Sequence, residues 1–211
     1  MLNLIRGVRE FQSGVFPSQR HMFTQLAQSQ HPEALFITCS DSRIDPNLIT
    51  NTDPGEIFVL RNIGNIVPPL GTAGDSEEAV IEYALVALGV KHIIICGHSH
   101  CGAMKGLLHP EGLGPVPAVA SWLTHAEMTR KVVERKHSGL QGEELLNAAV
   151  AENVVVQLEN LRTLPSVSQR LAVNELQLHG WVYQLETGEI FVYQPDAGQF
   201  RSFSEAYQAE F

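Results

Sequence analysis

The chain has few cysteines: Cys39, Cys96 and Cys101 are the three among its 211 residues. Its first residues, MLNLIRGVREFQSGVF, lack the apolar segment and small-residue cleavage site of a secretory signal. A small, odd cysteine count without an export signal argues against a disulfide framework. We therefore expect a cytoplasmic protein whose cysteines serve as core residues, nucleophiles or metal ligands.

Positive charge is also scarce. The chain has 14 lysine and arginine residues against 23 aspartate and glutamate residues, a formal net charge of −9. A nucleic-acid binder needs a basic surface, and so does electrostatic docking on anionic lipid, so the composition disfavours both. No apolar run approaches the roughly 20 residues of a membrane-spanning helix. We expect a soluble protein with no membrane span and no nucleic-acid partner.

The chain has no internal repeat and no convincing domain boundary, so we expect one domain over residues 1–211. Short apolar runs rich in β-branched residues predict buried strands at 34–38, 56–60 and 91–96. A helical pattern that ends at Gly89 separates the last two runs, which is typical of a right-handed crossover between parallel strands.

Further helices are predicted between about residues 115 and 160. Two segments in which apolar and polar residues alternate flank Glu186-Thr187-Gly188, and this pattern predicts a β-hairpin. The expected fold class is α/β: a central, mostly parallel sheet with flanking helices and an antiparallel edge hairpin.

The first 30 residues are predicted to form a helical arm, followed by the α/β core at 31–211. Apolar residues recur at helical spacing along one face of this arm: Leu4, Ile5, Val8, Phe11 and Val15. An apolar helix at a chain end must dock on something. It could dock on the rest of its own chain or on a second subunit.

Reactive side chains follow two of the predicted strands. Cys39 comes directly after the 34–38 strand, His98 comes two residues after Cys96, and Cys101 follows three residues later. Open α/β sheets place their sites at the carboxyl ends of strands. Two thiolates and one imidazole suit zinc, and three protein ligands leave a coordination position for water. The sequence predicts one catalytic zinc ion per chain, bound by Cys39, His98 and Cys101.

Asp41 and Arg43 stand beside the first ligand, in Cys39-Ser40-Asp41-Ser42-Arg43. An arginine partner keeps an aspartate ionised, so Asp41 could accept a hydrogen bond from zinc-bound water. Without that partner, Asp41 could close the site as a fourth ligand. A purely structural Asp41–Arg43 ion pair is the third reading.

The cysteines also allow other interpretations. Cys96 lies within an apolar strand and is best interpreted as a core residue. A thiol-nucleophile enzyme that uses Cys101 and His98 would leave Cys39 idle, so it is disfavoured.

The two motifs together, Cys-Ser-Asp-Ser-Arg at 39–43 and Gly-His-Ser-His-Cys-Gly at 97–102, resemble those of the β-class carbonic anhydrases. Residues 97–106 are most similar to the plant-like and cyanobacterial branch, which includes carboxysomal enzymes. Further motifs fall in family order: Gln30-His31-Pro32, Pro54-Gly55-Glu56, Arg61-Asn62 with Asn65, Glu82-Tyr83-Ala84 and Leu178-His179-Gly180-Trp181.

The resemblance implies a reaction, the reversible hydration of carbon dioxide to bicarbonate and a proton. Zinc-bound hydroxide, oriented by Asp41 paired with Arg43, would attack carbon dioxide. Five positions match those that line the substrate pocket: Gln30, Phe58, Ile63, Tyr83 and Gly102. In the family, the glutamine and the aromatic side chains reach the zinc across a dimer interface, and the N-terminal helix wraps the partner subunit.

The resemblance therefore also implies a homodimer or a higher homo-oligomer. It leaves two alternatives open: a carbon disulfide or carbonyl sulfide hydrolase on the same fold, and a non-catalytic zinc-binding scaffold. The expected location is the cytoplasm or a carboxysome, where shell or scaffold proteins would be partners. Carboxysomal relatives often extend further at the C-terminus, so a chain that ends at Phe211 is expected to be either a shorter type or a truncated one.

Overall fold

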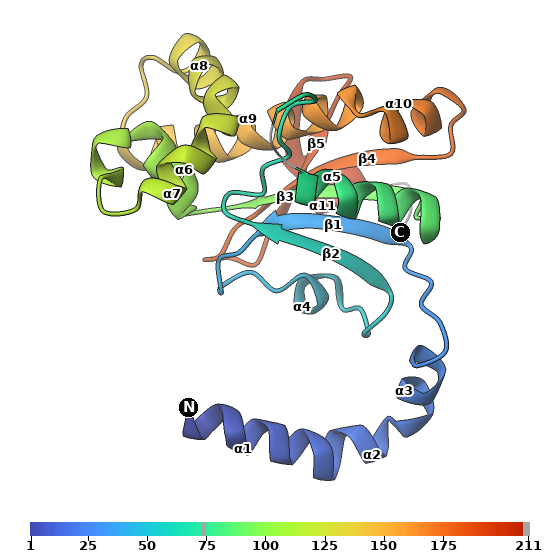
Figure 1. Cartoon of the computed structure of the whole chain (residues 1–211). Helices are drawn as coiled ribbons and strands as arrows, with labels where there is room; N and C mark the ends of the chain where they lie inside the picture. The colour runs from blue at the N-terminus through green and yellow to red at the C-terminus, as the bar shows by residue number, and fades with distance from the viewer. Residues whose placement is uncertain (73–74, 209–211) are drawn as a thin grey trace.

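The computed structural model describes residues 1–72 and 75–208, and its centre is a six-stranded sheet (Figure 1). The strands lie in the order β2-β1-β3-β4-β5-β6. The pairs among β2, β1, β3 and β4 are parallel, whereas β4–β5 and β5–β6 are antiparallel. The strands are β1 (Ala34–Cys39), β2 (Ile57–Asn62), β3 (His92–His98), β4 (Gln177–Tyr183), β5 (Ile190–Gln194) and β6 (Gln199–Ser202).

Both faces of the central strands are covered, which explains why their sequences read as continuous apolar runs. Along β1, Leu35 and Ile37 point into the larger core cluster, while Phe36 joins a smaller cluster on the other face. Strand β3 alternates in the same way, with Ile95 in the larger cluster and Cys96 in the smaller. The buried strands predicted at 34–38 and 91–96 are therefore confirmed.

Helices lie on both sides of the sheet. In Figure 1, α9 and α10 run above it and the short α4 lies below. After the arm, the helices and helical turns are α4 (Pro46–Thr50), α5 (Asp75–Glu82), η2 (Tyr83–Ala87), α6 (Gly102–Leu108), η3 (Pro110–Leu113), α7 (Pro117–Leu123), η4 (Thr124–Ala126), α8 (Glu127–Lys136), α9 (Gly142–Thr163), α10 (Pro165–Ala172) and α11 (Phe203–Ala206).

Two glycines allow α9 to pack closely on β3 and β4. A Cβ atom at Gly97 would lie 3.0 Å from methyl groups of both Val150 and Val154. A Cβ atom at Gly180 would lie 2.9 Å from methyl groups of Val154 and Leu158. Because Gly97 directly precedes His98, this close packing also fixes the end of the strand that carries a predicted metal ligand.

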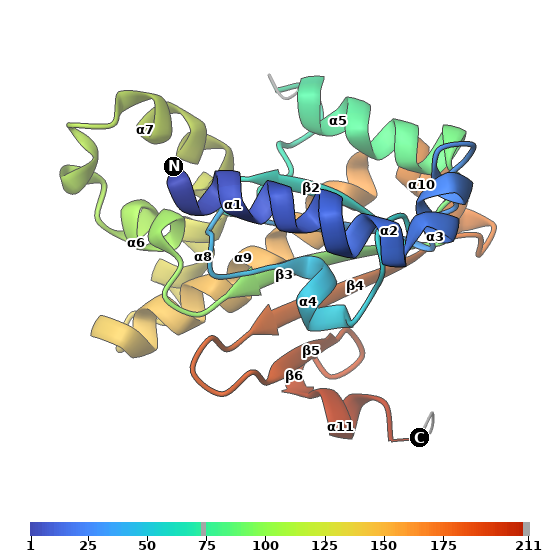
Figure 2. The same ribbon diagram turned by 90° about the horizontal axis from the view of Figure 1, so that it is seen from below.

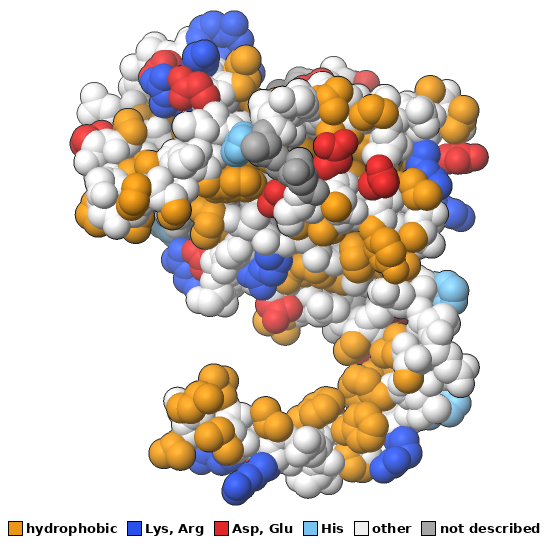
Figure 3. Space-filling view, viewed as in Figure 1, with side chains coloured by type: hydrophobic (Ala, Val, Ile, Leu, Met, Phe, Trp, Pro, Cys, Tyr) orange, Lys and Arg blue, Asp and Glu red, His pale blue; other side chains and the backbone are white. Residues whose placement is uncertain are grey.

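The N-terminal arm is helical, as predicted, and consists of α1 (Leu2–Glu10), η1 (Phe11–Val15), α2 (Phe16–Ser18) and α3 (Arg20–Leu26). None of these segments contains a buried residue. Figures 1 and 2 show the arm crossing the side of the sheet where α4 lies. Figure 3 shows hydrophobic side chains along the side of the arm that faces the body, across open space. Among the described residues, the rings of Phe11, Phe16 and Phe23 pack on one another, but Leu4, Ile5, Val8 and Val15 on the apolar face stay exposed.

The structure corrects three predicted strands. Strand β1 runs on to Cys39, and β2 spans Ile57–Asn62 instead of 56–60; Leu60 is its one buried residue, because β2 lies at the edge of the sheet. Strand β3 continues beyond Cys96 and includes His98, because it pairs with β4 as far as Tyr183. The predicted hairpin around Glu186 forms between β4 and β5, but a third antiparallel strand, β6, follows it. Across residues 1–72 and 75–208, no helix combines the length and hydrophobicity that crossing a bilayer requires.

Candidate metal centre

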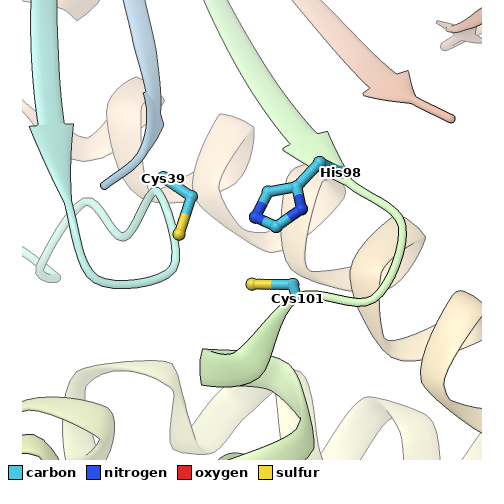
Figure 4. Close-up of side chains that lie close together, drawn as sticks. All are labelled: Cys39, His98 and Cys101. Carbon is cyan, nitrogen blue, oxygen red and sulfur yellow. The ribbon is translucent and has the colours of Figure 1, made fainter. Parts of the chain in front are cut away.

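The three predicted ligands meet at the carboxyl edge of the parallel strands. Cys39 ends β1, His98 ends β3, and Cys101 directly precedes α6. Figure 4 shows the two sulfur atoms and the imidazole ring turned toward one another. Their ligand atoms all lie within 4.8 Å of one another, and all three residues are buried. Within the described residues this is the one cluster of three or more such side chains with metal-site spacing.

The orientation of His98 fits a metal ligand. Its Nδ1 atom lies 2.8 Å from the carbonyl oxygen of Ser99, which leaves Nε2 to face the two cysteines. Nε2 is fully buried and has no hydrogen-bond partner among the described residues. A buried polar atom without a partner is costly, and a metal ion would remove that cost. In metal-binding histidines, the ring nitrogen that does not bind the metal usually donates a hydrogen bond to an acceptor such as a backbone carbonyl oxygen.

The two thiols influence each other's ionisation. The pKa of Cys39 is lowered to about 4, chiefly by the neighbouring Cys101 thiol and further by His98 and by the backbone N–H of Gly64, 3.4 Å from its sulfur. The pKa of Cys101 is raised by the neighbouring Cys39 and by burial. A divalent cation bound between these side chains would replace the thiol protons and be held by two thiolates and one imidazole, a donor set that suits zinc.

Asp41 and Arg43 form the pair that the sequence predicts as one reading. Arg43 donates from Nε to Asp41 Oδ1 at 2.9 Å and from Nη2 to Oδ2 at 2.7 Å, and its backbone N–H also donates to Oδ1 at 2.9 Å. These hydrogen bonds hold the pKa of Asp41 well below its usual range, so the carboxylate is ionised. Oδ2 of Asp41 lies 3.9 Å from the unpartnered Nε2 of His98. The ionised carboxylate is therefore next to the place where a metal would bind.

Arg61 supports the loop that carries Cys39 and Asp41. Its guanidinium donates to the carbonyl oxygens of Cys39 at 2.9 and 3.1 Å, Asp41 at 2.7 Å and Ile44 at 2.9 Å. In the sequence, Arg61 stands out only as part of a motif. Its role depends on its position opposite Thr38 in the β1–β2 register, and this register is known only from the folded sheet.

A buried row of amides on α9 supports the opposite side of the site. Asn153 donates to the carbonyl oxygen of Gly64 at 3.0 Å, and Gln157 accepts from the N–H of Val67 at 2.9 Å. Gly64 has a φ of +84°, a conformation that favours glycine, and it presents its N–H to the sulfur of Cys39. These amides could not be identified from the sequence, since polar residues in a helical pattern normally indicate the side of the helix that faces solvent.

The predicted pocket residues fall into two groups. Gly102 directly follows Cys101 in the chain, and Ile63 precedes Gly64, whose N–H contacts the sulfur of Cys39. Phe58 and Tyr83 lie elsewhere, with their rings 5.9 Å apart, and Tyr83 lines a surface hollow together with Gln30. Phe58 is four residues before the end of β2, about 13 Å along the strand from the metal edge. One chain therefore does not bring all five residues to its own site.

Cys96 is fully buried, as its interpretation as a core residue predicts. It packs in the smaller core cluster, outside the group formed by Cys39, His98 and Cys101, and burial raises the pKa of its thiol.

Together, the fold and the site define an α/β protein with a buried Cys-His-Cys cluster that could hold a metal ion, beside an ionised aspartate. The family model for carbonic anhydrase matches residues 34–190 of this chain. A carbonic anhydrase of Synechocystis sp. is 53% identical over 194 residues, which cover 92% of this chain and 71% of that protein. The chain belongs to the carbonic anhydrase family, an enzyme family.

Solved structures place it in the β class of that family. The structure of the β-carbonic anhydrase CcaA is 51% identical, with a TM-score of 0.93 over 96% of this chain and 98% of that one. A β-carbonic anhydrase of the ascomycete Sordaria macrospora, described as tetrameric, is 31% identical with a TM-score of 0.73, over 95% of this chain and 92% of that one.

Proposed function

We propose that this chain catalyses the zinc-dependent, reversible hydration of carbon dioxide to bicarbonate and a proton. The observation that carries the proposal is the site itself: three converging ligand atoms, one of them a buried imidazole nitrogen without a partner, beside an aspartate that Arg43 keeps ionised. A zinc ion held there would lower the pKa of a coordinated water to about 7 and so supply a nucleophile at neutral pH.

The residues of the chain would orient the reaction. Ionised Asp41 can only accept hydrogen bonds. At 3.9 Å from His98 Nε2, its Oδ2 is placed to accept one from the nucleophilic oxygen and so to direct a lone pair of that oxygen toward carbon dioxide. Arg43 occupies both carboxylate oxygens, which holds Asp41 beside the metal position rather than on it.

We propose further that the substrate pocket is completed by a second copy of the chain. Gln30, Phe58 and Tyr83 lie away from the ligands of their own chain and would line the site of the partner. The exposed apolar face of the arm supports this assembly, because docking on the partner would remove that face from water. The relative from Sordaria macrospora that is described as tetrameric also supports the proposal.

Two substitutions test the chemistry. Cys101→Ala should lose both zinc and activity, since two ligands hold zinc poorly. Asp41→Ala should bind one zinc per chain and yet lose most turnover. Zinc content and carbon dioxide hydration rate are measured on the same preparations. Full activity in a zinc-free preparation of the unaltered chain would refute the proposal, and turnover of carbon disulfide or carbonyl sulfide in preference to carbon dioxide would favour the alternative substrate.

The assembly is tested by the pair Leu4→Glu and Val8→Glu, made together in the apolar face of α1. We expect the oligomer to dissociate in sedimentation experiments and activity to fall with it. Arg6→Glu, on the opposite face of the same helix, is the control and should leave the oligomer intact.

The proposed location is the cytoplasm, with packaging in a carboxysome by shell or scaffold proteins as the finer proposal. It rests on the similarity of residues 97–106 to carboxysomal enzymes. Fractionation of the native host tests it: cosedimentation of the chain with carboxysome shells supports packaging, and recovery in the unsedimented fraction contradicts it.

A further inference from the structure

The turn between β4 and β5 contacts the loop that joins two of the metal ligands. Glu186, in this turn, accepts a hydrogen bond from the Ser99 hydroxyl at 3.0 Å, and its other carboxylate oxygen is hydrogen-bonded to Nε2 of the His100 ring. The Ser99 hydroxyl in turn accepts from the backbone N–H of Leu185 at 3.0 Å. Ser99 and His100 are the two residues between the ligands His98 and Cys101. A single exposed carboxylate thus holds both residues of the loop.

His100 adopts a backbone conformation that is uncommon for residues other than glycine. Its φ is +54°, in the left-handed region where residues other than glycine need support from their surroundings. In this conformation, the carbonyl oxygen of His100 accepts a hydrogen bond from Nη2 of Arg43 at 3.2 Å. The same Nη2 atom donates to Oδ2 of Asp41. The contact of Glu186 with the His100 ring is therefore linked to Asp41 through two hydrogen bonds.

Arg43 depends on these contacts for its position. Its side chain is 51% exposed, and besides Asp41 its hydrogen-bond partner among the described residues is the carbonyl oxygen of His100. Exposed ion pairs are weak by themselves, since water competes for both partners. If the carbonyl oxygen of His100 moved, Arg43 would lose the acceptor that turns its guanidinium toward Asp41.

We propose that Glu186 is a positioning residue that, through His100, holds Arg43 against Asp41 and so keeps the Asp41 carboxylate from binding the metal. This inference rests on the proposed function of the site, and it names the part of the fold that keeps the site open. Glu186 does not touch the metal ligands or the substrate position. It acts by fixing the conformation of the loop between His98 and Cys101.

The test uses the full chain loaded with cobalt in place of zinc, because the visible spectrum of cobalt reports its ligands. Azide is titrated into the cobalt protein, and carbon dioxide hydration is measured on the zinc protein. In Glu186→Ala, we expect Asp41 to bind the metal in most molecules and so to block azide. If this occurs in about nine molecules in ten, the apparent affinity for azide falls about tenfold. Turnover should fall by a similar factor, with one metal ion per chain retained.

Two further variants separate positioning from general damage. Glu189→Ala removes a glutamate from the same turn whose side chain forms no hydrogen bond or ion pair with the described residues, and it should behave as the unaltered protein. Glu186→Gln keeps an acceptor for the His100 ring and should recover most of the azide response. If Glu186→Ala does not fold, His100→Asn breaks the same contact, because asparagine tolerates positive φ but is too short to reach Glu186.

An azide response of Glu186→Ala, or of His100→Asn in its place, equal to that of the unaltered protein would overturn the proposal. So would an unaltered cobalt protein that does not respond to azide, since its site would already be closed. Failure of the proposed function looks different. The zinc protein would then not hydrate carbon dioxide, while the cobalt spectrum would still show whether Glu186 controls Asp41.

Discussion

The buried amide of Asn153 offers the sharpest test of how the fold supports the metal site. Its side chain makes three hydrogen bonds: to the carbonyl oxygen of Gly64 at 3.0 Å, from Gln157 Nε2 at 2.9 Å and from the Thr129 hydroxyl at 3.1 Å. Asn153 is 1% exposed, and Gln157 and Thr129 are fully buried. Asn153→Ala therefore leaves three buried polar groups without their partner.

The expected loss follows from these three groups. Each buried donor or acceptor without a partner costs about 1–3 kcal/mol, and a water molecule that entered the vacated space would recover part of this. We expect Asn153→Ala to lower the free energy of unfolding by about 3 kcal/mol, a large share of the about 5–15 kcal/mol of a typical domain. Thr129→Val is the matched control, because it removes one of the three bonds at nearly constant shape and should cost about 1 kcal/mol.

Urea unfolding at one fixed protein concentration measures both variants. Zinc affinity, from competition with a chelator, is the second measurement. Gly64 carries the N–H that contacts Cys39 Sγ, so zinc binding by Asn153→Ala should weaken by about tenfold. A cost for Asn153→Ala no larger than that of Thr129→Val would refute the claim that this amide supports the loop at Gly64.

Three other predictions concern the sheet. Burial, and to a smaller extent His92, lowers the pKa of His179 from 6.5 to about 4. The free energy of unfolding should therefore be highest above pH 6.5 and should fall toward pH 4, because over this range the unfolded chain binds a proton that the folded chain does not. In His179→Asn, this loss, about 2 kcal/mol after allowance for partial exposure, should disappear from unfolding curves measured across that range. Gly97→Ala should destabilise the protein by about 1–3 kcal/mol in urea unfolding, because its Cβ would lie 3.0 Å from a Val154 methyl group, and Val154→Ala should restore part of the loss. Arg61→Lys should retain zinc but lower turnover and speed hydrogen exchange over residues 39–44, since one ammonium group cannot replace the four hydrogen bonds of the guanidinium.

The main buried strands and the three candidate metal ligands could be identified from sequence patterns. The runs at 34–38 and 91–96 are continuous and apolar because both faces of those strands are covered, and this pattern can be read without a structure. Cys39 and His98 could be placed together because parallel neighbouring strands end at the same edge of a sheet. Asp41 and Arg43 are two residues apart, so their pairing was within reach of local reasoning as well.

Contacts between distant segments were decided only by the tertiary structure. Arg61 reaches the loop after Cys39 because of the β1–β2 register, Asn153 reaches Gly64 from a helix about 90 residues away, and Glu186 reaches His100 from a turn 86 residues away. No local pattern marks such residues, since a polar side chain in a helix or turn has the same sequence signature whether it faces water or a buried carbonyl. Local sequence patterns identify the candidate ligands Cys39, His98 and Cys101, whereas the contacts that position them come from segments that only the fold brings together.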